Sequence, residues 1–321
     1  MQVKVAESAP TAYRARPDEH RGRPPRASAP RWRSRKVQGL AYATPTAVFV
    51  TVFFLLPLLL VGQMSLSDWP LLTGDRGVNA PENYTDITDA PLFWPAVRFT
   101  LLYTGVVTVV LLGLALLLAL LVQESRPGAG FFRTVYFLPS ALGLASASLL
   151  FWGLYSPATG PLGDILDGLG LVDEEVSFLG TPTAALLSTV FLIVWKFAGF
   201  YMLILLVGLQ RIPHEVYEAA RMDGASRAQI FRSITLPLLR PSLALTLLLC
   251  VTGSLLAFDQ FFILTKGGPD NSTVTVVQLI YREAFQRLDL GTAAALSIIV
   301  LAVLLLLNAL QFRGLRRADE S

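Results

Sequence analysis

The stretch from Glu218 to Pro237, EAARMDGASRAQIFRSITLP, predicts two short helices separated by a glycine. Gly224 is expected to take a left-handed conformation just past the end of the first helix, where glycine is the commonest residue. Ser226 and Gln229 have the spacing of a capping box, in which each side chain bonds the backbone N–H of the other residue. We expect this box to open the second helix and Pro237 to end it.

The first of these helices is predicted to be an amphipathic surface helix. Pro213 can begin it without losing a needed N–H. Apolar and polar residues recur at helical spacing on its two faces, with Ile212, Val216, Ala219 and Ala220 on the apolar face and Arg211, His214, Glu215, Glu218 and Arg221 on the polar face. In the second helix, Ile230, Phe231 and Ile234 share one side.

The composition is that of a membrane protein. Of the 321 residues, 53% are hydrophobic and 15% are charged, whereas about a quarter of the residues in a soluble domain are charged. The single cysteine, Cys250, excludes a disulfide within the chain and a cysteine metal cluster. His20 and His214 lack the spacing of metal ligands, so we expect neither a metal nor a cofactor.

The first forty residues are strongly basic, with ten Lys or Arg against three acidic residues. Their Pro- and Arg-rich composition predicts a disordered tail over 1–40. A nucleic-acid-binding arm has a similar composition. A basic tail directly before a membrane span is better explained as a cytoplasmic topology signal, so we expect no nucleic-acid partner. The long apolar run behind it lacks a cleavage site and indicates an uncleaved span.

The rest of the chain predicts an all-α integral membrane protein, with a membrane domain over 41–315 and a short cytoplasmic tail over 316–321. A helix needs about 20 apolar residues to cross a bilayer, and each span must be helical because backbone groups facing lipid have to be paired within their own segment. Pro57 and Pro139 lie near span ends or indicate local kinks. The six predicted spans are approximately 43–61, 99–122, 134–155, 184–208, 242–264 and 290–310.

The basic residues between the spans predict the orientation. Segments 1–42, 123–133, 209–241 and 311–321 together hold twenty Lys or Arg, and the alternate segments 62–98, 156–183 and 265–289 hold five. Because basic residues favour the cytoplasmic side, both termini are predicted to be cytoplasmic. The stretch 218–237 then also lies in the cytoplasm, and the acidic segment 156–183 lies outside.

The same stretch resembles the EAA loop of the permease subunits of ATP-binding-cassette importers. In that family the loop is a cytoplasmic helix that docks into a cleft of a separate ATPase subunit. The alternative is an ordinary interfacial helix between two spans. The resemblance implies a coupling role for the residues at the matching positions and for Asp223 beside them: Glu218, Ala219, Ala220, Asp223, Gly224, Ile234, Leu236 and Pro237.

Three further stretches extend the resemblance to the first permease subunit of maltose- and glycerol-phosphate-type carbohydrate importers, over about residues 40–315. They are FFRTVYFLPSALGLASASLLFWGLY (131–155), WKFAGFYMLILLVGLQRIPHEVYEAARMDGA (195–225) and LAFDQFFILTKGGPDNSTVTVVQLIYREAF (256–285). The implied fold is the type I importer permease fold, with six transmembrane helices and a cytoplasmic coupling helix. Tyr281 and the turn containing Gly267, Gly268 and Pro269 are typical of carbohydrate members, and that turn is expected to lie outside.

No catalytic motif occurs in the chain. There is no G-x-x-x-x-G-K-[ST] phosphate loop, so ATP hydrolysis has to reside in a partner subunit. There is likewise no G-x-S-x-G elbow and no H-E-x-x-H. We therefore expect a transport subunit and not an enzyme.

Polar residues inside the predicted spans are the candidates for a substrate path. Ionisable groups inside a membrane, here Lys196 and Asp259, usually face a cavity or a partner. Sugars are bound by hydrogen bonds to their hydroxyls and by stacking on aromatic rings. Alternatively, Lys196 and Asp259 form a structural pair, and the small residues allow close helix packing. The candidate set is Trp195, Lys196, Thr252, Gly253, Ser254, Phe258 and Asp259.

The family resemblance also implies partners and a location. We expect a second homologous permease, two ATPase subunits, an external solute-binding protein, a carbohydrate substrate and membrane lipid, in the plasma membrane of a prokaryote. The same machinery can carry glycerol phosphate, a polyol or another solute. An ion-coupled secondary carrier is a rival, but it would be expected to show inverted repeats and interrupted helices.

Overall fold

The computed structural model describes residues 35–123, 128–157, 160–170 and 177–319. Within these ranges the chain forms helices and two isolated β-bridges, and no strand. The chain divides into two compact units, Met1–Leu56 and Pro57–Ser321. Most of the predicted basic tail, residues 1–34, and the last two residues, 320–321, lie outside the described residues.

The first unit contains α1 (Arg35–Val50) and a π turn, η2 (Thr51–Leu55). Residues 35–40, which the sequence places in the disordered tail, are therefore helical. The side chains described between residues 39 and 56 are all exposed. With α2 (Leu56–Met64), the apolar helix Gly39–Met64 is 26 residues long, which is enough to cross a membrane, and it contains the predicted span 43–61.

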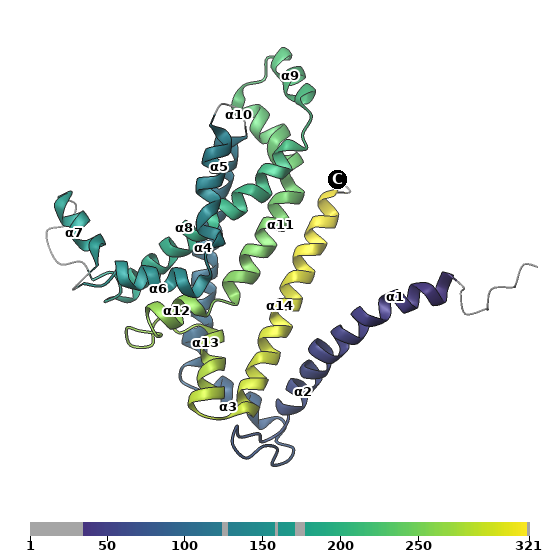
Figure 1. The fold of residues 1–321 in the computed structure, drawn as a ribbon, viewed down its shortest axis with the longest axis vertical. Helices are drawn as coiled ribbons and strands as arrows, with labels where there is room; N and C mark the ends of the chain where they lie inside the picture. The colour runs from purple at the N-terminus through teal and green to yellow at the C-terminus, as the bar shows by residue number, and fades with distance from the viewer. Residues whose placement is uncertain (1–34, 124–127, 158–159, 171–176, 320–321) are drawn as a thin grey trace, which may run out of the picture. The chain divides into compact units, whose positions relative to one another are not determined.

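Four long helices form the body of the second unit, as Figure 1 shows. α4 packs against α8 and α11, and α11 also packs against α14. Ala115 and Ala119 of α4 are fully buried, and a Cβ on Gly208 of α8 would collide with Ser242. Small residues at these contacts let helix backbones approach closely. The four helices are α4 (Phe93–Val122), α8 (Pro182–Gln210), α11 (Leu236–Leu255) and α14 (Leu290–Asp319).

The third predicted span, 134–155, is not one helix. It consists of α5 (Ala129–Phe137), the 3-10 turn η3 (Leu138–Ala141) and α6 (Leu144–Leu154), with a bend of 94° before α6. The chain becomes extended at Leu142 and Gly143, just beyond the kink expected at Pro139. Five helices in the described residues are long and apolar enough to cross a membrane, and six if this bent pair is one span. The count agrees with the six predicted spans.

The fifth predicted span, 242–264, is also interrupted. α11 ends at Leu255, and a short helix, α12 (Asp259–Leu264), begins after the three residues 256–258. The break at 256–258 is held by neighbours, because the Thr275 hydroxyl donates to the Ala257 carbonyl at 2.8 Å. The predicted span 242–264 lies within one apolar helical stretch, Arg227–Leu264, which is interrupted at 256–258.

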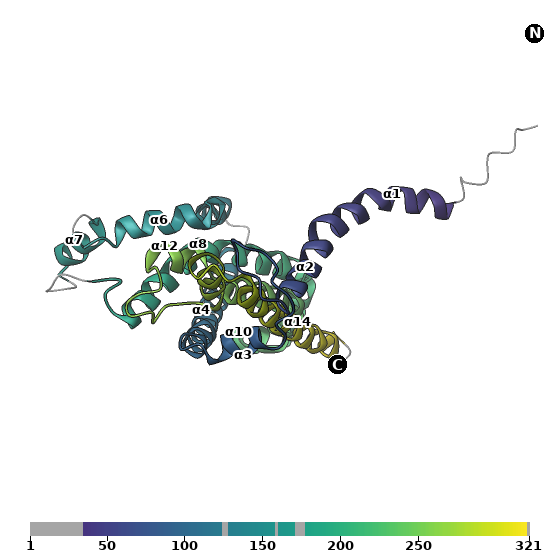
Figure 2. The same ribbon diagram turned by 90° about the horizontal axis from the view of Figure 1, so that it is seen from below.

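The connections between the long helices lie at opposite ends of the second unit. α9 (His214–Met222) and α10 (Arg227–Ile230) lie at one end in Figure 1, beside the start of α5. α3 (Glu82–Asp89), α13 (Val276–Tyr281) and the π turn η5 (Arg282–Gln286) lie at the other. Figures 1 and 2 both show α6 and α7 (Pro161–Gly168) extending to one side.

Candidate functional site

The loop between α8 and α11 has the local structure that its sequence predicts at its glycine. Gly224 takes a φ of +78°, and the Ala225 N–H bonds the Ala220 carbonyl at 3.0 Å. The Gly224 N–H also bonds the Arg221 carbonyl at 3.1 Å, and the two bonds together form a Schellman motif. A Cβ on Gly224 would meet no atom within 4 Å. The position therefore requires glycine for its backbone conformation and not for space.

The second helix of the loop begins as predicted but does not end at Pro237. The Ser226 N–H donates to Gln229 Oε1 at 2.8 Å, and the Gln229 N–H donates to Ser226 Oγ at 3.4 Å. α10 then passes through a π turn, η4 (Phe231–Thr235), directly into α11. In this turn the Leu236 N–H bonds the Phe231 carbonyl, five residues back.

This π turn explains why Pro237 does not stop the helix. In an ordinary α-helix the proline ring collides with the carbonyl four residues before it. A wider turn just before the proline changes that spacing. The same arrangement occurs at Pro57, where η2 ends two residues before the proline. The loop and the predicted span from 242 are consequently one continuous helical segment.

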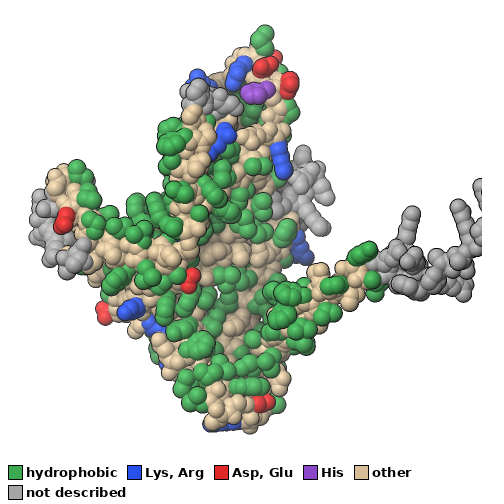
Figure 3. Space-filling model, viewed as in Figure 1, with side chains coloured by type: hydrophobic (Ala, Val, Ile, Leu, Met, Phe, Trp, Pro, Cys, Tyr) green, Lys and Arg blue, Asp and Glu red, His purple; other side chains and the backbone are tan. Residues whose placement is uncertain are grey.

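The helix α9 is largely uncovered by the rest of the chain. None of its side chains is buried, and Met222 at its end is 88% exposed. Its link to η4 within the described residues includes a 3.3 Å hydrogen bond between the hydroxyls of Tyr217 and Thr235. Figure 3 shows charged side chains around this end, with mostly hydrophobic faces below it. Of the predicted apolar face, Ile212 is buried and Ala220 half-buried, whereas Val216 and Ala219 are exposed.

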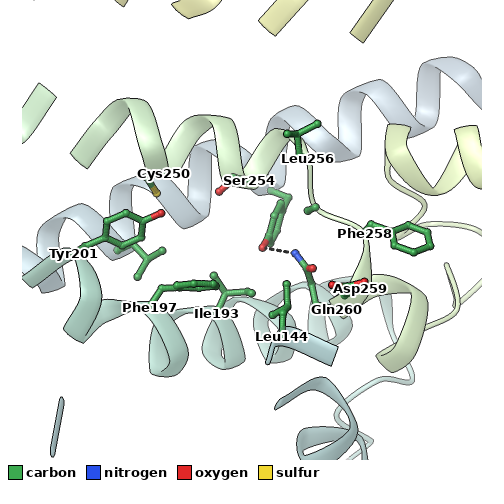
Figure 4. Close-up of a pocket in the computed structure, with 14 residues that line it drawn as sticks. Leu144, Ile193, Phe197, Tyr201, Cys250, Ser254, Leu256, Phe258, Asp259 and Gln260 are labelled. Carbon is green, nitrogen blue, oxygen red and sulfur yellow. Dashed lines mark hydrogen bonds between the residues drawn. The ribbon is translucent and has the colours of Figure 1, made fainter. Parts of the chain in front are cut away.

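A cavity of about 310 Å³ lies inside the second unit, between α4, α8 and α11 (Figure 4). The break at 256–258 builds one wall, while the ring of Phe258 points away from the centre of the cavity (Figure 4). Ser254, Tyr201 and Cys250 add polar atoms to a lining that is otherwise mostly apolar. The full lining is Tyr103, Leu111, Leu144, Ile193, Phe197, Tyr201, Cys250, Gly253, Ser254, Leu256, Ala257, Phe258, Asp259 and Gln260.

Gln260 and Tyr103 form the most buried polar contact of this cavity. Gln260 Nε2 donates to the Tyr103 hydroxyl at 3.1 Å, and both residues are almost completely buried. The Oε1 atom of Gln260 is buried without a hydrogen-bond partner. This oxygen is enclosed by the protein and is not open to the cavity.

The cavity contains four of the seven predicted path residues, namely Gly253, Ser254, Phe258 and Asp259. Thr252 faces α14, where its hydroxyl lies 3.4 Å from Asn308 Oδ1. Trp195 packs on Phe151, with ring centroids 5.1 Å apart, and lines a separate apolar groove. Sequence reasoning missed the Tyr103–Gln260 contact, whose partners are 157 residues apart. The only sequence signal was the position of Gln260 next to Asp259.

Lys196 is buried but does not line the cavity. Its Nζ atom donates to the carbonyl of Ser140 at 3.3 Å and to that of Leu142. These carbonyls lie at the bend of the third span, where helical hydrogen bonding stops. Within the described residues Lys196 forms no ion pair with Asp259, so the alternative of a structural pair between them is wrong.

The predicted external turn is tightly bonded. The Thr273 hydroxyl donates to the Gly268 carbonyl at 2.6 Å, and Gly267 has a φ of +88°. Arg282 donates to Asn271 Oδ1 at 2.8 Å and to the Lys266 carbonyl at 3.2 Å. Burial lowers the pKa of the Arg282 guanidinium.

Four aromatic rings lie between this turn and the cavity wall. Phe258 stacks on Phe262 with centroids 5.1 Å apart, and both rings contact Tyr281. Tyr281 in turn contacts Phe285, which is exposed. Phe258 is therefore held in place by neighbours on α12 and α13 while it lines the cavity.

Comparison with known proteins identifies the family. Residues 110–318 match the profile of the binding-protein-dependent transport system inner membrane component. The chain belongs to this family. The permease is thus a multi-pass inner-membrane component of an importer of the ATP-binding-cassette class, and in this family ATP hydrolysis belongs to separate subunits.

Several relatives of the permease have names that refer to sugars. It is 32% identical to the multiple sugar-binding transport system permease protein MsmF of Streptococcus mutans, over 87% of this chain and 95% of that one. It is 33% identical to the diacetylchitobiose uptake system permease protein NgcF of Streptomyces coelicolor, over 84% and 79%.

A solved relative has the same fold. A bacterial transporter involved in the import of the acidic polysaccharide alginate contains a chain with a TM-score of 0.78 and 25% identity, over 89% of the permease and 98% of that chain. The alginate transporter has also been solved in complex with a periplasmic protein that carries an alginate pentasaccharide.

Proposed function

We propose that the permease forms the membrane path for a sugar and is coupled to a separate ATPase through α9 and α10. The observation that carries the sugar path is the cavity between α4, α8 and α11, which combines the aromatic ring of Tyr201 with the Ser254 hydroxyl and the Asp259 carboxylate. Aromatic rings and hydrogen-bonding groups together are what a sugar requires. The names of MsmF and NgcF support the same substrate class.

The coupling role follows from the way the loop is connected to the cavity. α10, η4 and α11 form one helical segment from Arg227 to Leu255, about 44 Å long at the rise of an α-helix. That segment ends at the break that forms a wall of the cavity. Movement of the uncovered α9 by an ATPase would therefore reach the cavity wall through a stiff element. Alternating access follows when the wall opens to one side of the membrane at a time.

The proposed assembly contains a second homologous permease, two ATPase subunits and an external solute-binding protein. The alginate transporter supports the last of these, because it has been solved with a periplasmic protein. α9 and α10 would lie in the cytoplasm with the chain termini, and the turn at Gly267–Pro269 would lie outside. The positive-inside bias supports this orientation, and so do the positions of α9 and α13 at opposite ends of the unit.

The test is transport by the reconstituted complex. The permease is expressed with its second permease and ATPase subunits and placed in liposomes, with the binding protein outside and ATP inside. We expect uptake of a labelled sugar that requires both ATP and the binding protein. Uptake driven by an ion gradient without the ATPase would contradict the proposal and favour a secondary carrier. ATP-dependent uptake of a non-sugar solute alone would contradict the substrate class.

A further inference from the structure

We propose that the cavity selects uncharged sugars and rejects anionic ones, and that Asp259 is the residue responsible. This inference rests on the proposed sugar path and narrows its substrate class. It separates neutral sugars and polyols, which the cavity accepts, from sugar acids, sugar phosphates and glycerol phosphate, which it excludes.

The charges of the residues that line the cavity support this selectivity. Asp259 is the one charged residue among the fourteen that line it, and no Lys, Arg or His is among them. Lys196, on the neighbouring α8, is 3% exposed and donates to the Ser140 and Leu142 carbonyls. It is therefore not free to balance a ligand's negative charge. An anionic group of a ligand would face the Asp259 carboxylate, and repulsion between like charges is stronger in a partly enclosed cavity than in bulk water.

The hydrogen-bonding groups of the cavity also favour a neutral sugar over an anionic one. The Ser254 hydroxyl and the Asp259 carboxylate line the cavity, and both can accept hydrogen bonds. A sugar hydroxyl can donate to either of them, whereas an ionised carboxylate or sulfonate can only accept. An anionic group in this position would offer no donor to the Asp259 carboxylate in addition to facing its charge. A site built to bond a hydroxyl rejects analogues that lack a donor there.

The apolar part of the cavity is consistent with a small pyranose. Its volume of about 310 Å³ lies at the lower end of the range of roughly 300–1,000 Å³ found for small-molecule sites. The rings of Phe197 and Tyr201 on α8 border it (Figure 4). An aromatic ring provides a surface for the C–H face of a sugar, and charge is not needed for that contact.

The test measures the charge selectivity of the cavity without using a sugar. Gly253 lines the cavity and a Cβ there meets no atom within 4 Å, so Gly253→Cys with Cys250→Ala provides a single thiol in the site. In the full reconstituted complex, this thiol is reacted with two methanethiosulfonate reagents of similar size, one cationic and one anionic. We expect the cationic reagent to react roughly tenfold faster or more, relative to the ratio for a free thiol.

Matched variants locate the cause. Asp259→Asn should bring the ratio back toward that of the free thiol, and Asp259→Glu should keep it. Asp270→Asn removes the same charge from the exposed turn outside the cavity and should leave the ratio unchanged. Equal rates for the two reagents in the parent variant, or a ratio that survives Asp259→Asn in a correctly assembled complex, would overturn the inference.

Transport provides the second measurement and separates the two proposals. Asp259→Asn should raise the uptake of an acidic sugar relative to its neutral counterpart, for example glucuronate relative to glucose, when both are supplied at high concentration. If the reagents show charge selection but no sugar is transported, the proposed function fails and the electrostatic property of the cavity stands. If ATP-dependent sugar uptake is present and the reagents react equally, the proposed function stands and this inference fails.

Discussion

The Lys196 ammonium replaces hydrogen bonds that the third span loses where it bends. An isolated charge in the membrane interior is costly unless it is paired or bonded. Here the partners are the backbone carbonyls of Ser140 and Leu142, which have no helical N–H in their range. The same two hydrogen bonds thus pair both the buried ammonium group of Lys196 and the backbone carbonyls of the bend. The Phe197 ring, 4.9 Å from Nζ, adds a cation–π contact.

Replacing Lys196 with Met should destabilise the complex by about 2 kcal/mol, because it leaves buried carbonyls without donors. The measurement is the thermal stability of the purified complex in detergent, followed by size-exclusion chromatography. Lys266→Met, on the exposed turn, is the control and should change little. Because Lys196 and Asp259 do not pair, the double variant with Asp259→Asn should show no rescue. Recovery of stability in that double variant would contradict the described geometry.

The left-handed conformation of Gly224 sets the direction in which the chain leaves α9. Gly224→Val should strain the left-handed conformation by about 1 kcal/mol or more and misdirect α9. We expect weaker co-purification of the ATPase or loss of sugar-stimulated hydrolysis, while the permease still inserts and pairs. Gly224→Asn is the matched control, since Asn tolerates this conformation, and it should retain more activity. Normal transport with fully stimulated hydrolysis in the Val variant would show that the loop is only a linker.

Breaks and wide turns in the helices give the second unit its functional geometry. The bend before α6 places Leu144 at the cavity, and the break before α12 places Phe258 and Asp259 there. The π turn η4 carries α10 into α11 despite Pro237. The π turn η5 holds Glu283, which is buried and bonds Arg287 at 3.2 Å. Because Arg287 is 61% exposed, water weakens that ion pair.

The η5 turn should become less stable as the pH rises. Burial raises the pKa of the Glu283 carboxyl above its ordinary value of 4.5, and Arg287 opposes this only in part. The folded carboxyl therefore keeps its proton at pH values where the unfolded one has lost it, and stability falls as the pH rises through this range. The gain in thermal stability from Glu283→Gln should grow between pH 4.5 and pH 8. Glu215→Gln, at an exposed site, should show no such trend, and a constant gain from Glu283→Gln would contradict the argument.

Over the whole molecule, the distribution of loops predicts which end faces the cytoplasm. α9 and the start of α5 lie at one end and α13 at the other, in agreement with the twenty-to-five division of basic residues. In a Cys250→Ala background, a membrane-impermeant maleimide added outside should label Asp270→Cys and miss Ser226→Cys. Both positions are exposed in the isolated chain. The reverse pattern would invert the orientation and exclude docking of a cytoplasmic ATPase on α9.

Sequence alone predicts those features of the permease that depend on neighbours along the chain. The apolar runs indicate six spans because the bilayer sets their length. The Ser226–Gln229 box and the positive φ of Gly224 follow from caps that act over a few residues. Four of the seven path candidates line the cavity, because they cluster around one interrupted apolar run.

The remaining features depend on contacts between distant segments. Lys196 finds its carbonyl partners more than fifty residues away, and Gln260 meets Tyr103 across 157 residues. Local sequence preferences do not predict such contacts, because the contacts form only when α4, α8 and α11 pack against one another. The same packing separates Lys196 from Asp259 and leaves Asp259 as the single charge in the cavity.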